Sequence, residues 1–201
     1  MPETGRKGKG LMKKLWLVAL VALIFGGPAL AAERVVMETS LGTIMLELDE
    51  EKAPVTVKNF LGYVDRQFYD GTIFHRVIDN FMIQGGGFER GLKKKKTDPE
   101  IINEADNGLK NDKGTIAMAR TSVVDSATSQ FFINLKNNDF LNHRGKSSQT
   151  YGYAVFGRVV EGIDVVEKIG KVSTIRRGGH QNLPKPEVVI KTIRRAEKKS
   201  E

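Results

Sequence analysis

The chain has 201 residues, 40% of them hydrophobic and 28% charged, which is the composition of an ordinary globular protein with enough apolar material for a core. It contains no cysteine, which excludes disulfides, a thiol nucleophile and thiolate metal sites. The formal net charge of +8 falls to +4 when residues 1–31 are set aside, and so mild a charge does not by itself argue for nucleic-acid binding.

Residues 1–31 have the three-part organisation of a secretory signal peptide. A basic stretch, MPETGRKGKGLMKK, precedes the apolar run LWLVALVALIF, and Ala29-Leu30-Ala31 forms an A-x-A cleavage site. Met12 is an alternative start, because the segment that follows it is a complete signal. A retained membrane anchor is the other interpretation, but Gly26-Gly27-Pro28 interrupts a run that would need about 20 apolar residues. We therefore expect cleavage and no stable membrane insertion afterwards.

Eight short runs predict β-strands, because they are rich in β-branched and aromatic residues and are bounded by Gly, Asn, Asp or Pro. They cover residues 35–39, 44–48, 72–77, 81–85, 115–119, 131–135, 154–159 and 188–193.

Two segments have helical periodicity instead. One begins at Pro54 and carries Val57, Phe60, Leu61, Val64 and Phe68, and the other is GIDVVEK at 162–168. Long polar loops are predicted at 89–113 and 137–152. Many short strands with two helices favour a closed or nearly closed antiparallel barrel.

Several chemistries find little support in the sequence. The three histidines are far apart, and none has a second histidine at helical spacing, so we expect no metal site. The sequence lacks the G-x-S-x-G motif that would indicate a serine hydrolase. The glycines at 85–87 are not followed by G-K-[ST], so they indicate a bulge or tight bend rather than a phosphate cradle.

The remaining set of side chains is an arginine, glutamines and many Phe, Met, Leu and Tyr residues around FHRVIDNFMIQGGG. Such a set suits a reaction that neither makes nor breaks a covalent bond, and rotation about an X–Pro peptide bond is one. Its barrier of ~18–20 kcal/mol arises because rotation destroys amide resonance. A catalyst needs an apolar pocket for the proline ring and a donor, such as a guanidinium, that favours the twisted amide.

Four segments in the same order, FHRVIDNFMIQGGGF, GTIAMAR, SATSQFFINL and YAVFGRVV, resemble the cyclophilin-type peptidyl-prolyl cis-trans isomerases. The resemblance covers about residues 35–193 and implies a mainly β fold, a closed eight-stranded antiparallel barrel capped by two α-helices. It implies an isomerase domain at 32–195, followed by a charged tail at 196–201. It also implies an enzyme that needs no cofactor and acts on unfolded or partly folded Pro-containing polypeptides. The signal peptide and NEADNG at 103–108 are most similar to the bacterial periplasmic members, so we expect a role in folding exported proteins in the periplasm.

The resemblance also implies site residues. Arg76 would be the catalytic donor, Gln84 would orient it, and Phe81 would belong with them at the proline pocket. The other residues implied to contact the substrate are His75, Met82, Ala119, Arg120, Gln130, Phe132, Phe140, Leu141 and Tyr153.

Some positions depart from the family pattern. Phe140 stands where many members have tryptophan, from which we expect weak cyclosporin binding. Tyr153 replaces a histidine and keeps an apolar body with a polar tip, so the pocket should survive. Arg120 replaces an asparagine, and a second cation beside Arg76 would alter sequence preference. Asp79-Asn80 replaces a Pro-Gly turn, and these residues also turn the chain well.

Two other functions remain open at this point. The groove would equally suit a periplasmic holdase or scaffold that grips Pro-containing segments, with turnover incidental. The lysine run at 93–96 would suit binding to nucleic acid or to an anionic envelope, although a solvated loop is the favoured interpretation. We expect no nucleic-acid partner and a monomeric protein.

Overall fold

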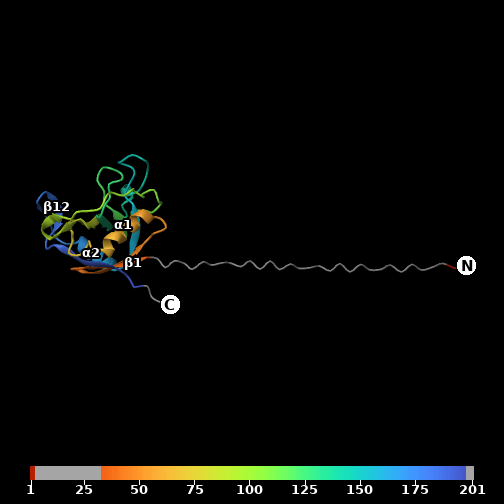
Figure 1. The fold of residues 1–201 in the computed structure, drawn as a ribbon, viewed down its shortest axis with the longest axis horizontal. Helices are drawn as coiled ribbons and strands as arrows, with labels where there is room; N and C mark the ends of the chain where they lie inside the picture. The colour runs from red at the N-terminus through yellow and green to blue at the C-terminus, as the bar shows by residue number, and fades with distance from the viewer. Residues whose placement is uncertain (3–32, 198–201) are drawn as a thin grey trace. The chain divides into compact units, whose positions relative to one another are not determined.

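The computed structural model describes Met1, Pro2 and residues 33–197. Residues 3–31 of the predicted signal peptide and residues 198–201 of the charged tail lie outside the described residues. Residues 33–197 form a β-barrel with two helices, α1 (Pro54–Asp65) and α2 (Ile163–Gly170) (Figure 1). In this part of the chain, no helix is both long and apolar enough to cross a membrane.

The main sheet has nine antiparallel strands in the order β3-β13-β1-β2-β10-β8-β9-β5-β4. Their bounds are β1 (Arg34–Thr39), β2 (Gly42–Leu48), β3 (Ile73–Phe74), β4 (Arg76–Ile78), β5 (Met82–Gly85), β8 (Thr115–Met118), β9 (Phe131–Asn134), β10 (Val155–Glu161) and β13 (Val188–Arg195). The predicted antiparallel barrel with two helices is confirmed. Apart from the strand predicted at 72–77, each predicted strand agrees with an observed one to within two residues at each end.

The strand predicted at 72–77 is broken at His75 into β3 and β4, which is why the sheet has nine strands and not eight. β3 pairs with β13 at one edge of the sheet, and β4 pairs with β5 at the other. The backbone N–H of His75 donates to the carbonyl of Gln84 at 3.0 Å. Consecutive pieces of one segment therefore form both edges of the sheet, and this nearly closes the barrel.

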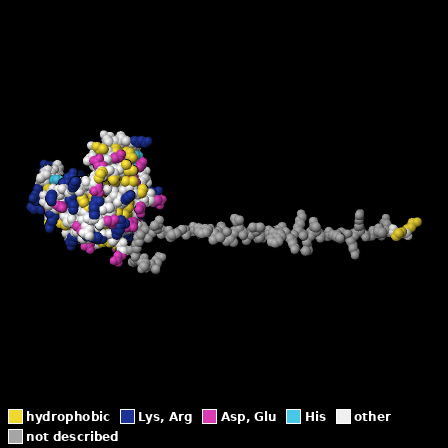
Figure 2. All heavy atoms as spheres, viewed as in Figure 1, with side chains coloured by type: hydrophobic (Ala, Val, Ile, Leu, Met, Phe, Trp, Pro, Cys, Tyr) yellow, Lys and Arg dark blue, Asp and Glu magenta, His cyan; other side chains and the backbone are white. Residues whose placement is uncertain are grey.

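Two small hairpins were not predicted. The first joins β6 (Phe88–Glu89) to β7 (Lys93–Lys94) across a short 3-10 turn, and the second joins β11 (Thr174–Arg177) to β12 (His180–Pro184). A space-filling view shows Lys and Arg side chains gathered at the end of the domain that carries β12 (Figure 2). A further 3-10 turn, η2 (Asp139–Leu141), lies within the loop predicted at 137–152.

Strand periodicity divides the apolar residues into two clusters. Ile83, Ile116 and Ile133 belong to the main core inside the barrel. The main core is also filled by α1, whose Phe60 ring lies 5.8 Å from that of Phe131. Met82, Ala117 and Phe132, each adjacent in sequence to one of these isoleucines, belong to a second cluster on the outer face. The same three strands therefore build both the core and a separate apolar surface.

Candidate functional site

Three neighbouring strands bring a cation and two glutamines together. Arg76 on β4 is opposite Gln84 on β5, and Gln84 is opposite Phe132 on β9. Residues directly opposite on antiparallel strands share a face, so these side chains project from the same side of the sheet. Arg76 Nη1 donates to Gln84 Oε1 at 3.4 Å, and Gln84 Nε2 donates to Gln130 Oε1 at 3.1 Å. The guanidinium is thus oriented by a chain of two amides.

The second apolar cluster begins directly beside this guanidinium. It consists of buried Met82, Ala117, Phe132, Leu141 and Val155, with Ile78, Phe81, Leu109, Ala119 and Tyr153 packed against them. Arg76 Nη1 lies 3.9 Å from the sulfur of Met82, and the guanidinium carbon lies 5.9 Å from the ring centre of Phe81. A half-buried cation therefore sits at the edge of an apolar surface, in contact with an aromatic ring.

Aromatic rings flank this surface on two sides. Tyr153 meets Phe132 edge-on at 5.7 Å between ring centres. Phe140 stacks on Phe81 at 5.6 Å and is 56% exposed. An exposed ring stacked on a half-buried ring is available to a ligand that approaches the cluster from solvent.

Three fully buried asparagines, which the sequence interpretation missed, hold the backbone around the cluster. Asn138 Nδ2 donates to the carbonyl of Phe81 at 2.9 Å and to Asn134 Oδ1 at 2.7 Å. Asn134 in turn donates to Asn111 Oδ1 at 3.2 Å.

Asn111 completes this network at the backbone of Leu141 and Tyr153. Its Nδ2 lies 3.2 Å from the carbonyl of Leu141 and 3.3 Å from that of Tyr153. The three amides therefore connect the backbone of three residues that face the cluster. Asparagines in polar loops carry no local sequence signal for such pairing, because 27 residues separate Asn111 from Asn138.

The glycine run makes room for Gln130. Gly86 has φ +83°, and a Cβ added at Gly87 would lie 2.6 Å from Cγ of Gln130. Any other residue at position 86 would have a strained backbone, and a side chain at position 87 would displace Gln130. The glycines thus serve a close approach of two chain segments beside the site.

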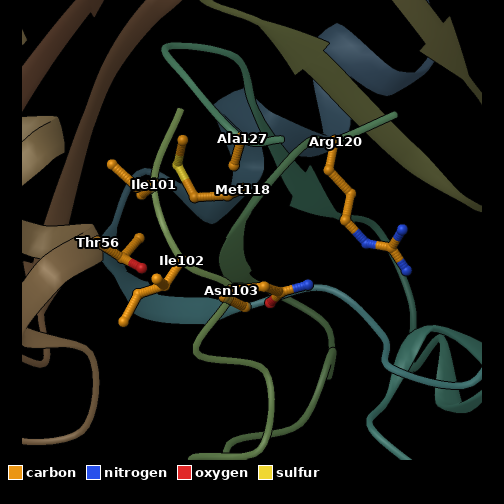
Figure 3. A pocket seen from close by; sticks show the side chains of 8 residues that line it. Thr56, Ile101, Ile102, Asn103, Met118, Arg120 and Ala127 are labelled. Atoms are coloured by element: carbon orange, nitrogen blue, oxygen red, sulfur yellow. The ribbon is translucent and has the colours of Figure 1, made fainter. Parts of the chain in front are cut away.

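Arg120 is engaged with the neighbouring loop. Its Nε donates to the carbonyl of Gly152 at 2.9 Å and its Nη2 to that of Ser148 at 2.8 Å, while its guanidinium carbon lies 4.9 Å from the ring centre of Tyr153. Figure 3 shows its side chain extending away from the apolar side chains of a small pocket, in which a water molecule has no room. Arg120 therefore ties the loop to Tyr153, and its effect on sequence preference stays a prediction.

His75 faces away from the apolar cluster. The residue is 5% exposed, and its ring lies 4.6 Å from the ring of Phe88 and 6.3 Å from that of His180. Its Nδ1 is buried and has no hydrogen-bond partner among the described residues. Burial lowers the pKa of His75 to about 4, so the ring is neutral at neutral pH.

His180 begins β12, in a part of the chain where no strand was predicted. The Gly178-Gly179 pair between β11 and β12 is a recognisable two-residue hairpin signal and would have located this hairpin. Among the residues that the structure describes, no cluster of three or more metal-ligating side chains occurs.

Comparison with known proteins shows which family the chain belongs to. The model of the family described as cyclophilin type peptidyl-prolyl cis-trans isomerase/CLD matches residues 34–195. Peptidyl-prolyl cis-trans isomerase A of Dickeya dadantii (strain 3937) is 52% identical over 181 residues, covering 89% of this chain and 94% of the relative. Peptidyl-prolyl cis-trans isomerase B of Escherichia coli (strain K12) is 57% identical over 159 residues, covering 79% and 97%.

A solved structure has the same architecture. The cyclophilin-type isomerase of Cryptosporidium parvum, crystallised in the presence of the dipeptide Ala-Pro, superposes with a TM-score of 0.68 and is 26% identical. The match covers 82% of this chain and 99% of that one. This chain belongs to the cyclophilin-type peptidyl-prolyl cis-trans isomerases, and it is an enzyme of that class.

Proposed function

We propose that this isomerase accelerates X–Pro isomerisation in exported polypeptides, with Arg76 as the group that stabilises the twisted amide. The observation that carries the proposal is the position of the Arg76 guanidinium. It is hydrogen-bonded to Gln84 and lies at the edge of the second apolar cluster, which contains Met82 and Phe132. A proline ring placed on this cluster would bring its own amide nitrogen close to a permanent donor.

The physical reason lies in how charge changes during rotation. As the X–Pro amide twists, resonance is lost and its nitrogen becomes pyramidal and basic, so a donor binds the transition state more strongly than the planar ground state. Interactions of this kind lower the barrier of ~18–20 kcal/mol, whereas equal binding of both states would not. The aromatic walls keep water away, which strengthens the interaction. No cofactor is required, and a monomer suffices.

The Arg76 role is tested by the rate of cis/trans exchange in a short X-Pro peptide and by proline-limited refolding. The loss of a hydrogen bond from a charged donor costs about 1.5–3 kcal/mol, so Arg76→Ala should lower kcat/KM by roughly tenfold to a hundredfold. Arg76→Lys should recover only part of this, because an ammonium lacks the planar fork of donors. Lys191→Gln, which removes an exposed charge on β13, is the matched control. An Arg76→Ala enzyme as fast as the parent would refute the mechanism.

The same variant separates catalysis from simple binding. If the chain acts chiefly as a holdase, Arg76→Ala will lose isomerisation and still suppress the aggregation of an unfolded Pro-containing protein to the same extent. If isomerisation is the function, slow refolding phases of such a protein will lengthen in step with the peptide rate.

Export is supported by the signal-like organisation of residues 1–31. Sequencing the N-terminus of the protein from the periplasmic fraction should show a chain that begins at Ala32. A chain that keeps residues 1–31 and stays with the membrane would contradict cleavage. Weak cyclosporin binding, which we propose from Phe140, is measurable by calorimetry on the processed protein.

A further inference from the structure

A cavity of about 460 Å³ lies on the other side of Arg76, between β4 and the β11–β12 hairpin. Its lining includes His75, Phe88 and His180, and it shares Arg76 and Gln130 with the candidate site. A peptide that contacts Arg76 at the apolar cluster would therefore pass directly beside this cavity.

The lining of the cavity carries one permanent positive charge, that of Arg76, and no carboxylate. Besides Arg76 and the two histidines, the polar residues of its lining are Gln130, Gln181 and Asn182. Within residues 33–197, the Arg76 guanidinium contacts Gln84 and Met82 and has no ion pair. The cavity thus offers amide donors and an unneutralised positive charge.

The hairpin beside the cavity adds further positive charge. Arg177 is opposite His180 in the register of β11 and β12, so both side chains project from the same face. The hairpin segment 174–184 contains Arg176, Arg177 and His180 and no acidic residue.

The lysine run at 93–96 lies next to this hairpin. Leu92, which precedes the run, has its Cδ1 3.6 Å from where a Cβ of Gly178 would be. The acidic residues nearby already form ion pairs, since Glu89 pairs with Lys93 and Lys95, and Glu187 pairs with Arg90. Lys94 is exposed and forms no ion pair within the described part of the chain. Positive charge therefore exceeds negative charge around the whole cavity, at the end of the domain where Figure 2 shows the blue side chains.

We infer that this cavity binds an Asp or Glu side chain of the substrate polypeptide, close in sequence to the proline that is isomerised. The inference rests on the proposed function and names a substrate class for the same site, acidic X–Pro segments. An extended chain advances about 3.3 Å per residue, so a cavity that shares Arg76 with the proline site is reached within about three residues of the proline.

A carboxylate fits this cavity better than a neutral side chain. It can accept charge-assisted hydrogen bonds from the amides and from the basic groups, and the surrounding field draws it toward the site. The lysine run then contributes to capture of the substrate at a distance, while His180 and Arg177 act on the bound carboxylate. Binding should benefit more than turnover, because the charge of the carboxylate is the same in the ground state and the transition state.

The test is a series of X–Pro peptides that carry Glu or Gln at each of about three positions on either side of the X–Pro pair. We expect one position at which Glu raises kcat/KM about fivefold over Gln at low salt, mainly through KM, as a partly exposed ion pair would. The gain should shrink as salt is added. Arg177→Gln and His180→Gln should each lower the Glu-to-Gln ratio, while the control Lys191→Gln should leave it unchanged.

Equal rates for Glu and Gln at every position, with normal turnover of the Gln peptides, would overturn the inference and leave the proposed function intact. A Glu advantage that Lys191→Gln reduces as much as Arg177→Gln does would also overturn it, because the effect would then be one of net charge. Loss of turnover on every peptide would instead count against the proposed function.

Discussion

Mild acid should destabilise the folded protein through His75. Removal from water is the main cause that lowers the pKa of this imidazole from 6.5 to about 4, and the nearby charge of His180 acts in the same direction. When the protein unfolds, the ring becomes exposed and its pKa returns to 6.5.

The sign follows from proton uptake. Between pH 6.5 and about 4, the unfolded state binds a proton at His75 and the folded state does not, so the free energy of unfolding falls as pH falls. The stability is fully present above pH 6.5, and the loss levels off below about pH 4. The full effect is about 3 kcal/mol, and the part between about pH 7 and about pH 5 is about 2 kcal/mol.

The assay is urea unfolding of the processed protein at about pH 7 and about pH 5. This window avoids the paired carboxylates of Glu47, Asp65 and Asp70, whose ordinary pKa values are 4.5 or lower and whose folded values are lower still. His75→Phe keeps an aromatic ring against Phe88 and removes the unpartnered Nδ1. Between the two pH values, the free energy of unfolding should therefore fall by about 2 kcal/mol less in this variant than in the parent protein.

His143→Gln is the control. The Nδ1 of His143 lies 2.8 Å from the carbonyl of Tyr151, outside the cavity that His75 lines, and this variant should lose stability as the parent does. If the parent and His75→Phe lose the same amount between the two pH values, the reasoning is refuted.

Three other changes test the surroundings of the site. Arg120→Ala should cost about 1–3 kcal/mol of unfolding free energy, measured by urea unfolding, and should raise KM more than it lowers kcat in peptide kinetics. Arg120→Lys should restore little, because only a planar fork of donors reaches both loop carbonyls. An unchanged KM would contradict this prediction. Asn134→Ala should cost about 1–3 kcal/mol of unfolding free energy, because Asn111 Oδ1 loses its donor, while Asn138 Nδ2 keeps its bond to the carbonyl of Phe81. A loss below the error of urea unfolding would show that the network contributes nothing. Phe140→Trp should tighten cyclosporin binding, measured by calorimetry, by about fivefold, as expected for roughly 1 kcal/mol of added ring contact. Equal affinities of the parent and the variant would argue against contact at this position.

Much of the barrel could be predicted from the sequence because its information is local. Alternation along β5, β8 and β9 is visible in Met82-Ile83 and Phe131-Phe132-Ile133, and a period of two decides which face each residue takes. Pro54 marks the first residue of α1 as expected. The family motifs, which are long and linked, indicated the isomerase class and placed Arg76 beside Gln84.

Only the tertiary structure decided how distant segments meet. It broke the segment 72–77 at His75, because that segment must pair with β13 on one side and with β5 on the other to close the barrel. It directed Arg120 to the carbonyls of a loop about 30 residues away in sequence. It also brought the rings of His75 and His180 to within 6.3 Å of each other, although 105 residues separate them in sequence. Such contacts leave no periodic trace in either segment, since they depend on the path of the chain between them.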